Sequence, residues 1–127
     1  MIKHWQTMHE YQRFLHNCKI SFDSSERVRL HTEIQIPRQK LRLFNTDKAM
    51  ELFLPLYSDT GRPATNQQQI LRSFILFFLL ISMGLTPPSL TLWVDRLEYA
   101  RVLAALIGCP LSSLPPLGSY YDFMDRL

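Results

Sequence analysis

Histidine, cysteine and the carboxylates are the residue types that most readily do chemistry, and one group of them falls close together near the start of the sequence. It consists of His4, His9, His16 and Cys18. All four are zinc-ligand types, and His9 and His16 share a helical face. The group nevertheless lacks the i, i+4 pair that a helical zinc site uses. We therefore expect no metal site here, and we interpret these residues as surface or partly buried packing residues.

The remaining chemistry-bearing residues indicate no enzyme class. Asp122 and Asp125 are three residues apart on an expected helix, which is typical of a solvated helix face. The sequence contains no G-x-S-x-G motif, glycine-rich phosphate loop or CxxC pair, so hydrolase, nucleotide-binding and redox functions lack a starting residue. Cys18 and Cys109, 91 positions apart, are expected to be reduced thiols of a cytosolic protein. We expect no catalytic residue, cofactor or small-molecule substrate.

Length and composition predict one globular domain that spans residues 1–127. The chain has 127 residues, of which 46% are hydrophobic and 20% are charged, which is enough for a core and excludes a disordered chain. Charged and polar residues interrupt the first twenty positions, so no secretory signal is expected. The uncharged run 73–85 is thirteen residues long, shorter than the roughly 20 that span a bilayer. These features predict a cytoplasmic protein with no membrane contact.

Positive charge is concentrated in the first half of the chain. Residues 1–50 contain nine basic and five acidic side chains, a net charge of +4, whereas residues 51–127 contain five and six, a net charge of −1. A modest excess of this kind favours weak, salt-sensitive attraction to nucleic acid.

Periodicity predicts a helix followed by an extended basic arm over residues 1–45. Apolar residues recur at helical spacing at Trp5, Met8, Tyr11, Leu15 and Cys18. From residue 28 to residue 36 apolar and polar residues alternate, which is typical of an extended strand or arm. Three cations then alternate after Pro37. They are Arg38, Lys40 and Arg42, and in an extended chain they would lie along one edge.

Residues 46–127 are predicted to form a helical core. Asn45, Thr46 and Asp47 supply capping side chains for a short helix that ends near Pro55. A long helix over residues 67–83 starts at a capping box formed by Asn66 and Gln69. Gly84 is expected to end the long helix with a positive φ angle. The predicted fold is therefore mostly α, with about five helices in total.

The two remaining helices complete this core. One is predicted to start at Thr86 and end near Gly108, and the other to start at a capping box formed by Ser119 and Asp122. Because the second starts only eight residues before Leu127, we expect that a longer protein would continue beyond this point.

The long helix, the Gly84 turn and the following helix could form a helix-turn-helix-like pair. The second helix would then present Arg96 and Arg101 to a DNA groove. It also carries Asp95 and Glu98, which phosphates would repel. Any helical domain contains helix pairs joined by glycine turns, so a purely structural role remains open.

Three stretches carry a family resemblance that covers about 70 residues, from residue 57 onward. They are LYSDTGRPATNQQQILRSFILFFLL, SLTLWVDRLEYARVLAALIGC and LPPLGSYYDFMDRL. In this order they resemble the amino-terminal domain of DDE-type insertion-sequence transposases. The matching positions are Gly61, Arg62 and Pro63; Leu71 and Arg72; Leu103, Leu106, Ile107 and Gly108; and Ser119, Tyr120, Tyr121, Asp122, Phe123, Arg126 and Leu127.

The resemblance implies a bacterial, nucleoid-associated DNA-binding region that recognises the terminal repeats of a mobile element. In such proteins it precedes an RNase H-like domain in which three acidic residues hold two divalent metal ions. Those positions would lie beyond Leu127, so this chain is expected to have no catalytic activity of its own. The aspartates Asp59, Asp95, Asp122 and Asp125 are not assigned that role.

Seven cations are the candidate DNA-binding residues. Arg38, Lys40 and Arg42 are expected to contact phosphates, and Arg62, Arg72, Arg96 and Arg101 to lie nearer the bases. Two of them have competing structural interpretations. Arg62 could pair with Asp59, and Arg72 could lay its stem along apolar neighbours.

A protein-interaction or dimerisation module, possibly a truncated transposase remnant, is the alternative function. The apolar segment Ile70–Leu85 could exceed what a small domain covers, and the surplus would then mark a homodimer face or a docking site. Residues 28–36 could likewise add as an edge strand to a partner. Salt separates the two functions, because it weakens DNA binding steeply and leaves an apolar dimer intact.

Overall fold

The computed structural model describes residues 4–21, 24–25, 35–57 and 65–127. These parts are mostly α-helical and include no β-strand, which confirms the predicted fold class. The described helices are α1 (Met8–Ser21), α3 (Gln35–Arg42), α4 (Thr46–Phe53), α5 (Gln67–Ser82), α6 (Leu90–Tyr99), α7 (Arg101–Ile107) and α8 (Leu117–Arg126), with short 3-10 turns at Leu54–Leu56 and Leu111–Ser113. None of the helices in the described parts is both long enough and apolar enough to cross a membrane.

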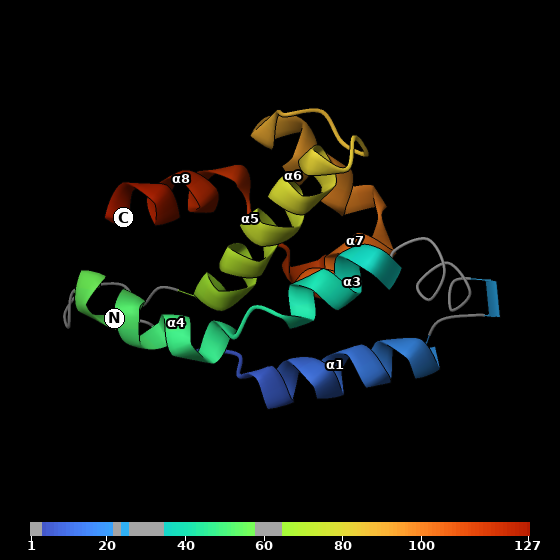
Figure 1. Ribbon diagram of the computed structural model, residues 1–127, viewed down its shortest axis with the longest axis horizontal. Coiled ribbons are helices and arrows are strands. Elements are labelled where there is room, and N and C mark those ends of the chain that lie inside the picture. Colours follow the sequence, from blue (N-terminus) through green and yellow to red (C-terminus); the bar gives the residue numbers. More distant parts are fainter. Residues whose placement is uncertain (1–3, 22–23, 26–34, 58–64) are drawn as a thin grey trace.

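Helix α5 is the centre of the molecule. Figure 1 shows it crossing the middle, with α8 on one side and α3 and α4 on the other, and it also packs against α7. Its side chains are apolar on almost every side, so neighbours must cover most of its surface. Ile70 and Leu76 are completely buried as a result.

The amphipathic stripe predicted near the start of the chain is confirmed. Tyr11 and Leu15 on α1 are buried, and α1 packs against α7. Trp5 precedes the helix and is buried as well, with its ring stacked on Phe53 of α4. Phe53 in turn contacts Phe123 of α8 at a ring separation of 5.3 Å. An aromatic row therefore joins the start of the described chain to its last helix.

The extended arm is wrong for the part of it that the structure describes. Gln35–Arg42 forms helix α3, whereas residues 26–34 lie outside the described residues. Pro37 is compatible with this helix because it occupies the first turn, where a backbone N–H has no intrahelical partner. Pro37 and Leu41, four residues apart, are both buried, and α3 packs on α5. Burial of this pair explains why helical structure prevails over the alternating pattern.

Three helix starts differ from the predicted capping boxes. Asn66 precedes α5 with a φ of 59° and its side chain makes no cap hydrogen bond. Ser89, not Thr86, caps α6, since a residue that precedes a proline is disfavoured in helical conformation and Pro87 precedes Pro88. Helix α8 begins directly after Pro116, with no side-chain cap. Of the three capping residues predicted for α4, Asn45 caps it, accepting a hydrogen bond from the amide of Asp47.

Helix ends were predicted more accurately than starts. Gly84 and Gly108 have φ angles of 71° and 90°, and both follow helices at the expected places. The single helix predicted between residue 86 and residue 108 is wrong, because Ala100 has φ −113° and ψ 82° and separates α6 from α7. The apolar spacing continues across this break because both helices bury residues toward the same core.

Candidate nucleic-acid interface

Arg72 is placed in the interior, not on a DNA-binding surface. It is 1% exposed, and its guanidinium lies over the Tyr11 ring, 3.5 Å from the centroid. Its Nη1 donates to Gln6 Oε1 at 2.6 Å, and its Nη2 donates to Thr46 Oγ1 at 3.3 Å. Burial lowers the pKa of Arg72 to about 10. The proposed base contact by Arg72 is therefore incompatible with this fold, in which the guanidinium itself is buried among polar and aromatic groups.

The groups around Arg72 form a buried polar cluster that joins distant segments, and we call it the Arg72 cluster. Gln6 Nε2 donates to the carbonyl oxygen of Gly108 at 3.2 Å. Gln68 Nε2 donates to Thr46 Oγ1 at 3.3 Å. A Cβ atom at position 108 would overlap Gln6 Oε1 and lie 3.2 Å from Arg72 Nη1. Glycine at this position thus allows the N-terminal segment to approach the end of α7.

A second buried network links three helices through Ser73. Trp93 Nε1 of α6 donates to Ser73 Oγ at 2.9 Å, and Tyr120 Oη of α8 lies 2.8 Å from the same oxygen. Burial raises the pKa of Tyr120 to about 12, so its hydroxyl stays protonated. The function of this network is structural, because it satisfies the polar atoms of two buried aromatic residues.

The three cations predicted on the arm do not form one edge. Two residues apart in a helix correspond to about 200° around the axis, so Arg38 and Lys40 point in different directions. Arg38 is half-buried and Lys40 is exposed. Arg42 is the last residue of α3, and its side chain lies outside the described residues.

Arg96 and Arg101 are both exposed, but they lie in different settings. Arg96 Nη1 donates to the carbonyl oxygen of Leu85 at 3.1 Å, which joins α6 to the turn that follows α5. Arg101 is the first residue of α7. Asp95 and Glu98 are exposed on α6 as well, so the surface of this helix carries both signs of charge. Arg62 lies outside the described residues.

The predicted helix-turn-helix-like pair corresponds to α5 and α6. Their contact is aromatic, with the rings of Phe77 and Trp93 stacked at 5.6 Å. Val94 and Leu97 are also buried, which leaves Thr91, Asp95 and Arg96 among the exposed polar side chains of α6. If α6 lay in a DNA groove, it would therefore offer few hydrogen-bond donors to the bases.

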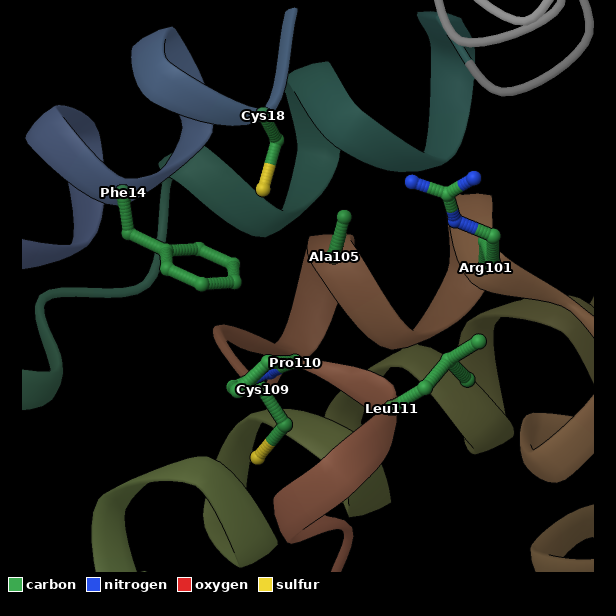
Figure 2. Close-up of a pocket in the computed structure, with 7 residues that line it drawn as sticks. All are labelled: Phe14, Cys18, Arg101, Ala105, Cys109, Pro110 and Leu111. Atoms are coloured by element: carbon green, nitrogen blue, oxygen red, sulfur yellow. The ribbon is translucent and has the colours of Figure 1, made fainter. Parts of the chain in front are cut away.

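A pocket of about 230 Å³ lies between α1 and α7 (Figure 2). Its lining residues are Phe14, Cys18, Arg101, Ala105, Cys109, Pro110 and Leu111. Figure 2 shows the sulfur of Cys109 pointing away from Cys18. Burial raises the pKa of Cys109 to about 12 and also raises the pKa of Cys18. Both thiols are thus held in the un-ionised, weakly nucleophilic form at neutral pH.

Sequence reasoning missed one polar surface on the solvent side of α1, which we call the outer face of α1. It consists of His9, Gln12, Arg13, His16 and Asn17, and these five exposed residues line a shallow depression of about 290 Å³. The available signal was the helical period: these positions lie opposite the apolar stripe that was recognised.

Comparison with known proteins does not assign this chain. No family model, curated protein or solved structure matches it. Among the described residues, no three metal-ligating side chains lie close enough to hold an ion. What the described surface does offer is exposed cations and amides, which are groups that bind phosphate oxygens.

Proposed function

We propose that this chain is a helical DNA-binding domain of the transposase amino-terminal type. It recognises the ends of a mobile element in the bacterial nucleoid and has no catalytic activity of its own. The observation that carries the proposal is the placement of the resembling segments. Leu71 and Arg72 lie in α5, the leucine-rich segment ends at Gly108 after α7, and the aromatic-Asp-Phe segment forms α8.

These segments belong to one core, so the family pattern is consistent with the packing. Leu106 and Tyr120 are completely buried, and Phe123 is 2% exposed. Helix α5 packs against both α7 and α8. We therefore expect transposase amino-terminal domains that share this sequence pattern to pack the corresponding helices in the same way.

DNA contacts are assigned to the exposed cations. Lys40, Arg96 and Arg101 are exposed on three different helices. Phosphate contacts position a protein on the duplex, and base contacts specify the sequence. We assign Lys40 to phosphate, and Arg96 and Arg101 to positions nearer the bases.

Fluorescence anisotropy tests the proposal. The purified chain is titrated with a labelled duplex from the flanks of its own gene and with a scrambled duplex, at 50 mM and 200 mM salt. With four to six phosphate contacts, affinity should fall by about 100- to 1000-fold between these concentrations. The flanking duplex should bind more tightly, and equal or absent binding to both would overturn the proposal.

Single substitutions test which exposed cations contact the DNA. Arg96→Gln and Arg101→Gln should reduce the preference for the flanking duplex. Lys48→Gln is the matched control, because it removes one exposed cation from α4, outside the proposed contacts. Thermal unfolding of Arg96→Gln checks that loss of the hydrogen bond to Leu85 does not disrupt the fold.

Self-association is the second candidate function, and one observation favours it. Phe78, in the middle of α5, is 61% exposed, and its ring lies 5.5 Å from that of Phe77. Contiguous exposed apolar surface marks interaction sites, and Phe78 would be the centre of such a surface in a dimer. Sedimentation at increasing salt tests it: a salt-resistant dimer that Phe78→Gln dissociates would support this function, and a monomer would exclude it.

A further inference from the structure

We infer that the outer face of α1 is a further DNA contact, which binds the phosphate backbone of the duplex and does not read its sequence. This inference rests on the proposed DNA-binding function and adds a surface to it. None of the residues on this face belongs to the seven cations proposed from the sequence.

The geometry of α1 directs these side chains to solvent. At about 100° per residue, His9, Arg13 and His16 fall within one narrow sector of the helix. Tyr11 and Leu15, on the opposite side, are buried in the core. Burial of that apolar side fixes the orientation of α1, so the outer face cannot turn inward.

The outer face carries no acidic side chain. Glu10, the one carboxylate among the described residues of α1, lies at the edge of this face, about 60° from Arg13 around the helix axis, and its Oε2 is 2.9 Å from His4 Nε2. This hydrogen bond lowers the pKa of Glu10, so the carboxylate is ionised and has a local partner. Asp47 accepts a hydrogen bond from the backbone amide of Met8 at the beginning of α1. Neither carboxylate lines the depression.

The composition of the face fits phosphate oxygens. Arg13 contributes a permanent cation with several N–H donors, and Gln12 and Asn17 contribute amide donors. The seven helical steps from His9 to His16 cover about 10 Å along the helix axis. This length allows contact with more than one phosphate of a strand. A lipid surface does not fit, because the apolar side of α1 that would enter it is already buried.

Two variants of α1 test the inference with the same two duplexes. Arg13→Gln removes the permanent charge, and Gln12→Glu adds a negative charge while keeping a good helix-forming residue. Arg13→Gln should weaken binding to the flanking and scrambled duplexes by the same factor. It should also reduce the slope of log affinity against log salt by about one, which corresponds to about a 3-fold smaller loss of affinity between 50 mM and 200 mM salt. Gln12→Glu changes the net charge by the same amount and should also weaken binding to both duplexes.

Controls separate failure of this inference from failure of the proposed function. Lys48→Gln on α4 removes the same charge and should leave the slope closer to that of the parent chain. If the parent chain binds the flanking duplex but both α1 variants keep its affinity and slope, the inference is overturned and the proposed function stands. If the parent chain binds neither duplex, both are overturned. Inorganic phosphate, added at constant ionic strength, should not displace the duplex; displacement would indicate a site for free phosphate instead.

Discussion

Arg72 shows how a single charged side chain can organise the interior of a small domain. Its hydrogen bonds go to the neutral oxygens of Gln6 and Thr46, and its planar group covers the Tyr11 ring. Burial lowers its pKa to about 10. The cost of burial is therefore offset by contacts that reach three other segments of the chain.

Arg72→Ala should be strongly destabilising. It leaves a cavity and removes the donor on which Gln6 and Thr46 depend, so we expect the free energy of unfolding to fall by about 3 kcal/mol or more. Arg72→Met should cost less, because it retains most of the stem volume. Urea unfolding measures the free energy of unfolding of both variants. If both lost the same small amount, the Arg72 cluster would contribute little to stability.

Because Cys109 is buried, we expect the free energy of unfolding to decrease in mild alkali. Burial raises the pKa of its folded-state thiol to about 12, from an ordinary value of 9.0. Above pH 9 the unfolded chain therefore releases a proton that the folded chain retains, so stability falls as the pH rises. We expect Cys109 to contribute about 1 kcal/mol of loss between pH 8 and pH 10.

Urea unfolding under reducing conditions at pH 8, 9 and 10 checks this expectation. At pH 10, where the range ends, Tyr120 of the unfolded chain has reached its ordinary pKa of 10.0 and Arg72 of the folded chain its pKa of about 10. Tyr120 lowers the stability and Arg72 raises it, so these two effects largely offset each other. Cys109→Ala should flatten the pH dependence more than Cys18→Ala does. An unchanged slope in Cys109→Ala would contradict the assignment.

At the scale of elements, Gly84 and Gly108 each follow the end of a helix and can be compared directly. Both have positive φ, but a Cβ at Gly84 meets open space, whereas one at Gly108 overlaps Gln6 Oε1. Gly84→Ala should therefore cost about 1 kcal/mol, from backbone strain alone. Gly108→Ala should cost more, because Gln6 must move away from Arg72. If urea unfolding gave the same loss of stability for both variants, displacement of Gln6 would have no effect on the free energy of unfolding.

Elements whose signals are local were predictable from the sequence. The stripe of α1, the Asn45 cap of α4 and the glycines after α5 and α7 follow from spacing or from one residue's backbone preference. Helix α3 was missed because its alternating pattern suggested a strand, whereas contact with α5 decides its conformation. The break at Ala100 was missed because α6 and α7 bury residues on a common side.

The candidate site was less predictable than the fold, since a charged residue's exposure depends on distant segments. Arg72 lies in an apolar helix and Arg96 in an amphipathic one, but this difference alone does not decide that the guanidinium of Arg72 is buried and that of Arg96 is exposed. The contacts that bury Arg72 come from residues 26 and 66 positions away. The outer face of α1 is, by contrast, predictable from periodicity, because its residues lie opposite the apolar stripe of the same helix.

At the scale of the whole molecule, the aromatic row and the Arg72 cluster predict that the chain unfolds as one unit. Trp5 and Trp93, the two tryptophans of the sequence, lie in different parts of the core and are both buried. In Trp93→Phe and Trp5→Phe, the remaining tryptophan should report a urea transition that coincides with far-UV circular dichroism. An earlier transition at Trp5 would show that the N-terminal segment detaches separately.

The position of α1 against α7 also sets the order of events during synthesis. Tyr11 Oη bonds the carbonyl oxygen of Leu106, and Gln6 bonds that of Gly108, across separations of 95 and 102 residues. At roughly 5–20 residues per second, a ribosome needs roughly 5–20 s to add the residues between them. Throughout this time the nascent chain exposes the apolar side of α1 without its α7 partner. Helix α1 is therefore made well before the helix that covers it, and in that interval its apolar side is a binding surface for a chaperone of nascent chains.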